Sequence, residues 1–224
     1  MTFSWLFFAA IAFAILDWVS AWKEWTVRLY VAKPATLIFL ILWSLQQTHW
    51  QGGMIWFGAA LIFSLLGDVA LMLNARYFLA GVAAFLFAHV MYLIGFNQNF
   101  SPLSMGSVLT ALLVGMAASQ ILKVIRPGIQ QMPGARKMLP AMTVYGMALT
   151  LMLLSALLTM SNPAWNIEAA VIVSVGACLF FVSDSTLSYD RFVKKLKHGR
   201  CWVHVTYHLG QITLITGVVM HFVK

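Results

Sequence analysis

Two aspartates lie inside long apolar runs of this chain, Asp68 in Met54–Leu73 and Asp184 in Trp165–Leu187. A charged side chain in the apolar interior of a membrane costs about 3 kcal/mol or more, so such residues are candidates for a function. Two carboxylates in one low-dielectric site need not carry the same charge, because burial and mutual repulsion can keep one protonated beside an ionised partner. Such a pair combines an acid with a base and suits a hydrolysis that protonates one atom while it activates water.

Further polar side chains inside the apolar runs are candidates for binding substrate or water. His89 and Tyr92 lie three residues apart, and Tyr207 and Gln211 four apart, so each pair shares one face of a helix. Hydrogen bonding between helices is the structural alternative for His89 and Tyr92. Asp68 and Asp184 could likewise be structural, paired with Lys33 or with hydroxyls of other helices, and Lys33, beside Pro34, could simply extend to the interface. The full set of substrate-binding candidates is Lys33, His89, Tyr92, Tyr145, Ser183, Tyr207 and Gln211.

The composition indicates which elements position these residues. The 224 residues are 62% hydrophobic and only 9% charged, whereas soluble domains carry roughly 25% charged residues. This excludes a cytosolic enzyme, a disordered tail and a nucleic-acid-binding module, so no nucleic-acid partner is expected. We predict an all-α, polytopic membrane bundle that occupies residues 1–224 as one domain. Its eight transmembrane helices are expected at Phe3–Ser20, Tyr30–Leu45, Met54–Leu73, Tyr77–Phe96, Leu103–Leu122, Met138–Met160, Trp165–Leu187 and Trp202–Phe222.

The basic residues predict the orientation of the bundle. Thirteen of the fourteen Lys and Arg residues lie in or beside alternate breaks between the runs, and Lys224 alone lies on the other side. Because basic loops stay cytoplasmic, both termini are expected on the non-cytoplasmic side of a bacterial inner membrane. A signal peptide begins with a basic segment, but no Lys or Arg precedes Lys23. Met1–Leu16 is therefore expected to be a retained helix rather than a signal peptide. Apart from Lys33, the basic residues are expected to set topology and take no part in chemistry.

In this orientation, the polar groups of six runs fall at a similar depth, in the cytoplasmic half. This predicts one polar cavity open to the cytosol or the inner leaflet. Asp17, close to the first basic break, is instead expected at the membrane interface.

Two other functions fit some of these residues. His204 and His208 lie four residues apart, and with Asp68 or Asp184 they could hold zinc in an intramembrane amide or ester hydrolase. Intramembrane Asp and Lys residues also occur in proton-coupled transporters. A transporter is disfavoured because the polar groups lie to one side and no pair of interrupted midplane helices is present.

Several short motifs, taken together and in order, resemble the YhhN-type lysoplasmalogenase family over nearly the whole chain. They are Lys33-Pro34, Gly67-Asp68, Phe78-x-x-Gly81-x-x-x-Phe85-x-x-x-His89-x-x-Tyr92, Tyr145, Gly176-Ala177-x-x-Phe180-x-x-Ser183-Asp184 and Tyr207-x-x-x-Gln211. The resemblance implies a membrane enzyme that cleaves the vinyl ether bond of lysoplasmalogens into a fatty aldehyde and a glycerophospho-headgroup. His204 and His208 are not part of the family pattern, which disfavours the zinc hypothesis.

The residues and the resemblance suggest one mechanism. One of Asp68 and Asp184 would protonate the alkene carbon, and the other would stabilise the resulting oxocarbenium ion and activate water. Tyr145, Tyr207, Gln211 and His89 would position water and the ether oxygen, while Lys33 would hold the phosphate or adjust the charge of an aspartate. This mechanism needs no metal or cofactor, and its partners are a lysophospholipid substrate and the membrane lipid. Another ether lipid or an epoxide remains an alternative substrate.

Overall fold

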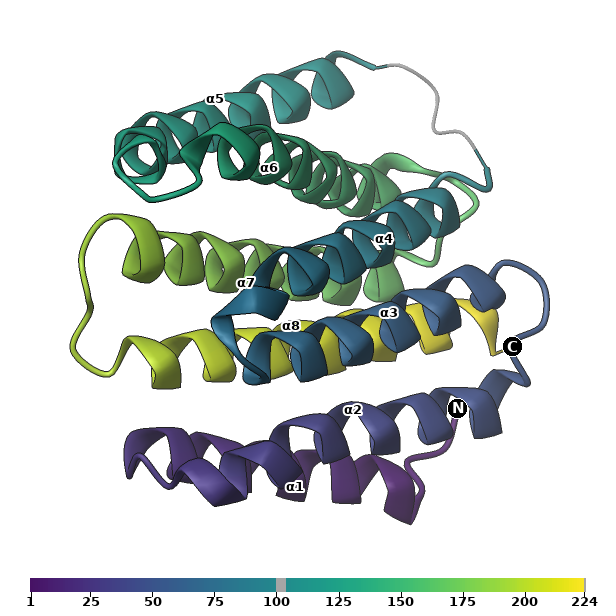
Figure 1. The fold of residues 1–224 in the computed structure, drawn as a ribbon. Coiled ribbons are helices and arrows are strands. Elements are labelled where there is room, and N and C mark those ends of the chain that lie inside the picture. The colour runs from purple at the N-terminus through teal and green to yellow at the C-terminus, as the bar shows by residue number, and fades with distance from the viewer. Residues whose placement is uncertain (100–103, 224) are drawn as a thin grey trace.

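The computed structural model describes residues 1–99 and 104–223, and within them every regular element is helical (Figure 1). Two short 3₁₀ turns, Ala75–Tyr77 and Thr159–Ser161, accompany the main helices. The α-helices of the described part are α1 (Trp5–Trp22), α2 (Thr26–Thr48), α3 (Met54–Met72), α4 (Phe78–Phe96), α5 (Met105–Gln130), α6 (Ala135–Leu158), α7 (Ile167–Phe192) and α8 (Gly199–Phe222).

Each predicted apolar run corresponds to one of these eight helices, and most boundaries differ by only a few residues. The largest differences are at the basic ends: α5 continues to Gln130 rather than Leu122, and α7 to Phe192 rather than Leu187. Lys and Arg are good helix formers, so a basic segment can extend a membrane helix instead of ending it. Leu103, where the fifth run was predicted to begin, and Lys224 lie outside the described residues.

Seven of the described helices, α1 to α7, are long and apolar enough to cross a membrane. Helix α8 is 24 residues long, but three histidines and Gln211 lower its mean hydropathy. It packs against α7, α1, α2 and α3. A helix surrounded by other helices can carry polar groups because its neighbours, rather than lipid, satisfy them.

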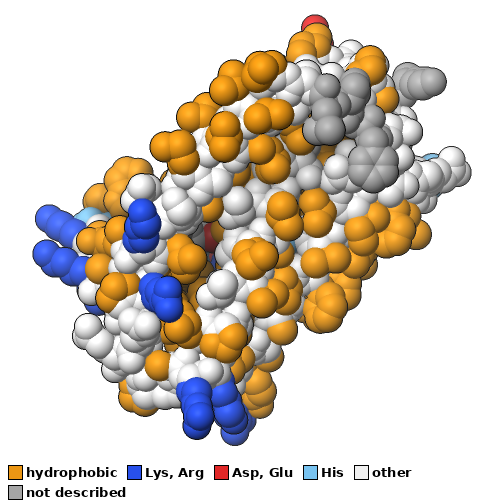
Figure 2. All heavy atoms as spheres, turned by 90° about the horizontal axis from the view of Figure 1, so that it is seen from above, with side chains coloured by type: hydrophobic (Ala, Val, Ile, Leu, Met, Phe, Trp, Pro, Cys, Tyr) orange, Lys and Arg blue, Asp and Glu red, His pale blue; other side chains and the backbone are white. Residues whose placement is uncertain are grey.

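The helices run back and forth along one axis, with both described chain ends at the right of the view (Figure 1). The α1–α2 hairpin forms one flank, and α5 forms the opposite flank, where it packs against α6 and α7. Lys and Arg side chains gather at the left end, while the long sides are mostly apolar (Figure 2). The surface therefore has the pattern of an integral membrane protein, with its basic end opposite the chain ends.

Glycines bring α7 and α8 close enough for their backbones to touch. A Cβ atom added at Gly176 would overlap the backbone nitrogen of Leu214, and one at Gly210 would lie 2.8 Å from the backbone nitrogen of Phe180. Small residues permit this approach between membrane helices. Further along the same interface, the Ser183 hydroxyl donates a hydrogen bond of 3.0 Å to the Val203 carbonyl. The spacing between the polar residues of α7 and those of α8 depends on this contact.

We expect Gly176→Ala to lower the free energy of unfolding by about 1–3 kcal/mol, because the added methyl group meets backbone that cannot rotate away. The matched control is Gly115→Ala on α5, where an added Cβ meets nothing within 4 Å. The control should be neutral or gain up to about 1 kcal/mol. Thermal unfolding of the purified proteins in detergent checks both, and equal stability of the two variants would contradict the prediction.

Candidate functional site

Asp68, near the end of α3, is fully buried and contacts polar side chains of two other helices. Its Oδ1 lies 2.7 Å from Nζ of Lys33 on α2. Its Oδ2 accepts a hydrogen bond of 2.8 Å from the hydroxyl of Tyr207 on α8. The Lys33 ammonium also lies 5.1 Å from the centre of the Tyr207 ring, within reach of a cation–π attraction. Asp68 is therefore held in a buried ion pair by residues distant in sequence.

Asp184, on α7, has different partners. The Tyr145 hydroxyl from α6 donates a hydrogen bond to its Oδ2. His89 Nε2 on α4 lies 3.2 Å from the same hydroxyl and 3.5 Å from the same carboxylate oxygen. Oδ1 of Asp184 makes no hydrogen bond or ion pair to any residue in the described part of the chain. This carboxyl group thus has one oxygen engaged and one available.

Both aspartates line one small cavity, the central cavity, of about 40 Å³. Lys33, Tyr145 and Tyr207 also line it, and a space of this size has room for water. With Ser183, six of the residues predicted from sequence therefore meet around one space, although they come from five helices. Polar groups from five of the six predicted runs thus meet here, and the predicted opening of the cavity to the cytosol or inner leaflet stays a prediction.

His89, Tyr92 and Gln211 lie behind or beside this cavity. His89 is fully buried against Tyr145 and Asp184 and orients them rather than lining the cavity. Ser183 lines the cavity, but its hydroxyl is bonded to backbone. Tyr92 donates a hydrogen bond of 2.6 Å to Gln211 Oε1, and both side chains are fully buried away from the cavity wall.

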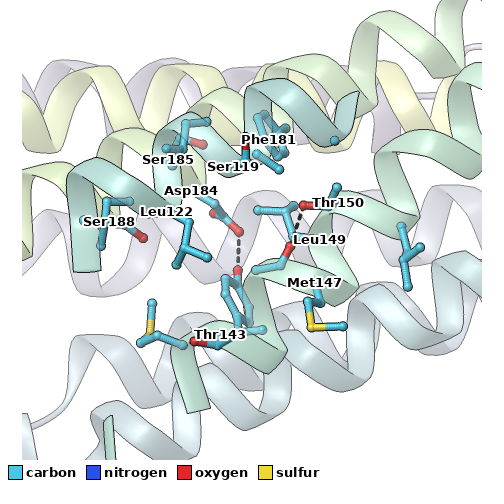
Figure 3. Close-up of a pocket in the computed structure, with 18 of the residues that line it drawn as sticks. Ser119, Leu122, Thr143, Met147, Leu149, Thr150, Phe181, Asp184, Ser185 and Ser188 are labelled. Carbon is cyan, nitrogen blue, oxygen red and sulfur yellow. Dashed lines mark hydrogen bonds between the residues drawn. The ribbon is translucent and has the colours of Figure 1, made fainter. Parts of the chain in front are cut away.

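A larger apolar pocket, of about 320 Å³, lies between α5, α6 and α7. Leu149 and Thr150 of α6 and Phe181 of α7 are among its lining residues, and Asp184 lies on its wall (Figure 3). Tyr145 and Asp184 line both this pocket and the central cavity, so the two spaces adjoin. An acidic side chain is visible in a hollow of the apolar face (Figure 2).

A third space, the basic vestibule, has a volume of about 380 Å³ and lies toward the basic end. Arg191, Lys195 and Arg200 line it, and Lys33 and Arg191 line both the vestibule and the central cavity. The sequence predicts only a topological role for Arg191. The sequence feature that could have indicated a role at the site is its spacing. Asp184, Ser188 and Arg191 lie at i, i+4 and i+7 on α7, along one face of the helix.

The two histidines considered as zinc ligands face a third aspartate. Nδ1 of His204 lies 2.7 Å from Oδ2 of Asp17, and Nδ1 of His208 lies 3.5 Å from the same oxygen. The predicted grouping of these histidines with Asp68 or Asp184 is therefore wrong, because their face of α8 turns toward α1. Asp17 is fully buried, so neighbouring helices surround it, and its predicted depth at the membrane interface stays a prediction. Within the described ranges, no three His, Cys, Asp or Glu residues are arranged to hold a metal ion.

Apolar helices around buried, paired carboxylates define a class of protein: a helical integral membrane protein with a polar site inside its bundle. Comparison with known sequences is more specific. A sequence model of the YhhN family matches residues 28–218, so the chain belongs to this family and the resemblance is confirmed. The matched segment contains every candidate site residue from Lys33 to Gln211.

Named relatives cover most of the chain. A Sus scrofa protein named lysoplasmalogenase TMEM86B is 32% identical over 159 residues, which are 71% of this chain and 61% of that protein. The Homo sapiens protein of the same name is 29% identical over 85% of this chain and 74% of its own length. An Escherichia coli O157:H7 protein, named uncharacterized membrane protein YhhN, is 24% identical over 96% of this chain and 98% of its own. No solved structure matches the chain.

We expect Lys33→Met to lower the free energy of unfolding by about 3–5 kcal/mol, because it leaves the Asp68 carboxylate buried without its cation. Adding Asp68→Asn should recover much of this loss, since no unpaired charge then remains. Thermal unfolding of the two single variants and the double variant in detergent measures the coupling. A double variant no more stable than Lys33→Met would show that the ion pair does not control this site.

Proposed function

We propose that this protein is an intramembrane ether hydrolase. It cleaves the vinyl ether bond of a lysoplasmalogen-type lysophospholipid to a fatty aldehyde and a glycerophospho-headgroup. The observation that carries the proposal is that Asp68 and Asp184 line one water-sized cavity, which adjoins an apolar pocket. The substrate class follows the names of the TMEM86B relatives.

The two carboxyl groups differ in their partners, which supports a division of roles. Asp68 shares its buried position with the Lys33 ammonium at 2.7 Å, a contact that favours the ionised form against the cost of burial. Asp184 has no Lys or Arg within ion-pair distance among the described residues, and its Oδ2 accepts from Tyr145. We therefore assign the role of the acid to Asp184, through its free Oδ1, and the role of the anion to Asp68.

The reaction follows from this assignment. Asp184 transfers its proton to the alkenyl carbon distant from the ether oxygen, which leaves an oxocarbenium ion and an aspartate anion. Asp68, held by Lys33 and Tyr207, stabilises this cation and takes a proton from the attacking water. The hemiacetal that forms collapses to aldehyde and alcohol when its hydroxyl proton passes to the departing glycerol oxygen. One water molecule is consumed, and both carboxyl groups return to their starting charge after a proton moves between them.

The alkenyl chain occupies the apolar pocket in this proposal. The pocket adjoins the central cavity at Asp184 and Tyr145, so a chain lying in it would present its first carbons to the acid. His89 and Ser183 hold α4, α7 and α8 around the reacting atoms. The hydrogen bond from Tyr92 to Gln211 joins α4 to α8 away from the cavity. No cofactor takes part in these steps.

The proposal includes an orientation. All eight helices span the membrane as one domain of residues 1–224, both termini lie on the non-cytoplasmic side, and the site faces the cytoplasmic half of a bacterial inner membrane. The gathering of Lys and Arg at one end of the molecule supports this orientation (Figure 2).

Replacing either carboxyl group should abolish most of the activity. We expect Asp68→Asn and Asp184→Asn each to reduce aldehyde release from a lysoplasmalogen by about 10²–10⁴-fold, the usual range for loss of general acid–base catalysis. The matched control is Glu168→Gln, a carboxylate on the first turn of α7 that is exposed at the far end of the same helix as Asp184. Mass spectrometry of the aldehyde, trapped as an oxime, provides the measurement.

The same assay separates the alternatives. In D₂O, the aldehyde should carry one deuterium on the carbon next to the carbonyl, because that carbon receives the catalytic proton. Fatty acid release that a chelator abolishes would favour the zinc amide or ester hydrolase. Folded Asp variants with wild-type activity would falsify the acid–base proposal, and proton-coupled lipid uptake without cleavage would favour the transporter.

The apolar pocket should determine which chain lengths are accepted. Gly146 lines this pocket, and an added Cβ there meets nothing within 4 Å, so Gly146→Leu should fill part of the space without distorting the helices. We expect activity on long-chain relative to short-chain lysoplasmalogen to fall about tenfold. Val144→Leu, at an exposed position outside the pocket, is the control. An unchanged chain-length profile would contradict this placement of the chain.

A further inference from the structure

A lysophospholipid carries a phosphate that needs a cationic partner, and Lys33 is poorly placed to provide it. Its ammonium lies 2.7 Å from Asp68, and its side chain is only 10% exposed. If the phosphate took this cation, Asp68 would remain buried as an unpaired anion, which is costly. The phosphate therefore needs a different group.

The basic vestibule contains such groups. Of its four cationic residues, Lys33 is paired with Asp68 and Lys195 lies 2.7 Å from Asp190. Arg191 and Arg200 have no carboxylate within 4.0 Å among residues 1–99 and 104–223. Two guanidinium groups thus face this space without an ion pair among the described residues, although Asp190, which also lines the space, attracts Arg200 from beyond ion-pair distance.

Arg191 is the better placed of the two. Its guanidinium carbon lies 3.6 Å from the centre of the Phe78 ring, so a stacking contact orients the planar group and leaves its edge for ligands. It lines the central cavity as well as the vestibule. It also follows Asp184 by seven residues, about 10 Å along the same face of α7, and its long side chain can shorten that distance.

We propose that Arg191, assisted by Arg200, binds the phosphate of the lysophospholipid in the basic vestibule and thereby sets which bond reaches Asp184. This inference rests on the proposed function and adds a specificity site to it. Only the glycerol unit separates the phosphate from the vinyl ether, so a phosphate held at Arg191 places the ether oxygen beside the central cavity. The guanidinium fork matches phosphate oxygens in a bidentate geometry, which an ammonium cannot reproduce.

Binding is tested first, with uncleavable ligands, so that the result does not depend on catalysis. A saturated alkyl-ether glycerophosphoethanolamine should raise the unfolding temperature of the wild-type protein in detergent more than the corresponding alkylglycerol, which lacks phosphate. Arg191→Gln should lose this difference, and Arg191→Lys should retain part of it. The matched control is Arg126→Gln, an exposed guanidinium on α5 outside the three spaces.

Kinetics then give the size of the effect. Arg191→Gln should raise KM for the phosphate-bearing alkenyl substrate about tenfold to hundredfold, the usual cost of losing a charged hydrogen-bond partner. Both KM and kcat for an alkenylglycerol without phosphate should stay within about twofold of wild type.

Three results would overturn the inference. If Arg191→Gln weakened stabilisation by the ether phospholipid and by the alkylglycerol equally, Arg191 would have a structural role. If the variant still distinguished the two ligands as the wild type does, the phosphate would bind elsewhere. Inorganic phosphate that stabilises the wild type as strongly as the ether lipid would indicate a free-phosphate site. A wild type that binds the ether phospholipid through Arg191 but cleaves no vinyl ether would instead contradict the proposed function alone.

Discussion

The ion pair between Lys33 and Asp68 is the constraint on which the site depends. Placing both charges inside an apolar bundle is costly unless they remain in contact, and they lie 2.7 Å apart. The pair joins α2 to α3, and Tyr207 adds α8 through its hydrogen bond to the same carboxylate. Asp184 differs: within the described ranges its polar contacts are to Tyr145 and His89.

Three spaces of different polarity adjoin around this pair. The apolar pocket ends at Asp184, the central cavity holds both aspartates, and the basic vestibule begins at Lys33 and Arg191. The order matches a single-chain phospholipid, with its apolar tail, polar glycerol linkage and anionic headgroup. Peripheral α5 covers the apolar pocket with little buried surface of its own, so lipid could enter from the membrane between α5 and its neighbours.

Much of this arrangement could be predicted from the sequence. The apolar runs locate all eight described helices, and the depth of each polar residue, counted from the basic end, predicts one shared polar site. Asp68, Asp184, Lys33, Tyr145 and Tyr207 meet there, whereas Tyr92 and Gln211 lie away from the cavity wall. Helix ends were less predictable at α5 and α7, because a basic segment can end a helix or extend it. The rotation of α8 was not predictable either: His204 and His208 turn toward Asp17 on α1, and no local pattern specifies which neighbour faces which side.

By itself, the sequence determined what must be buried and at what depth, because apolar runs have to span lipid and isolated charges inside them need partners. Only the tertiary structure decided which residues those partners are. The ammonium of Lys33 is paired with Asp68 and is not free for a phosphate. Arg191 lines the cavity and is more than a charge that sets topology. The physical reason is that depth follows from position along one helix, whereas pairing depends on the rotation and spacing of helices packed across glycines such as Gly176 and Gly210.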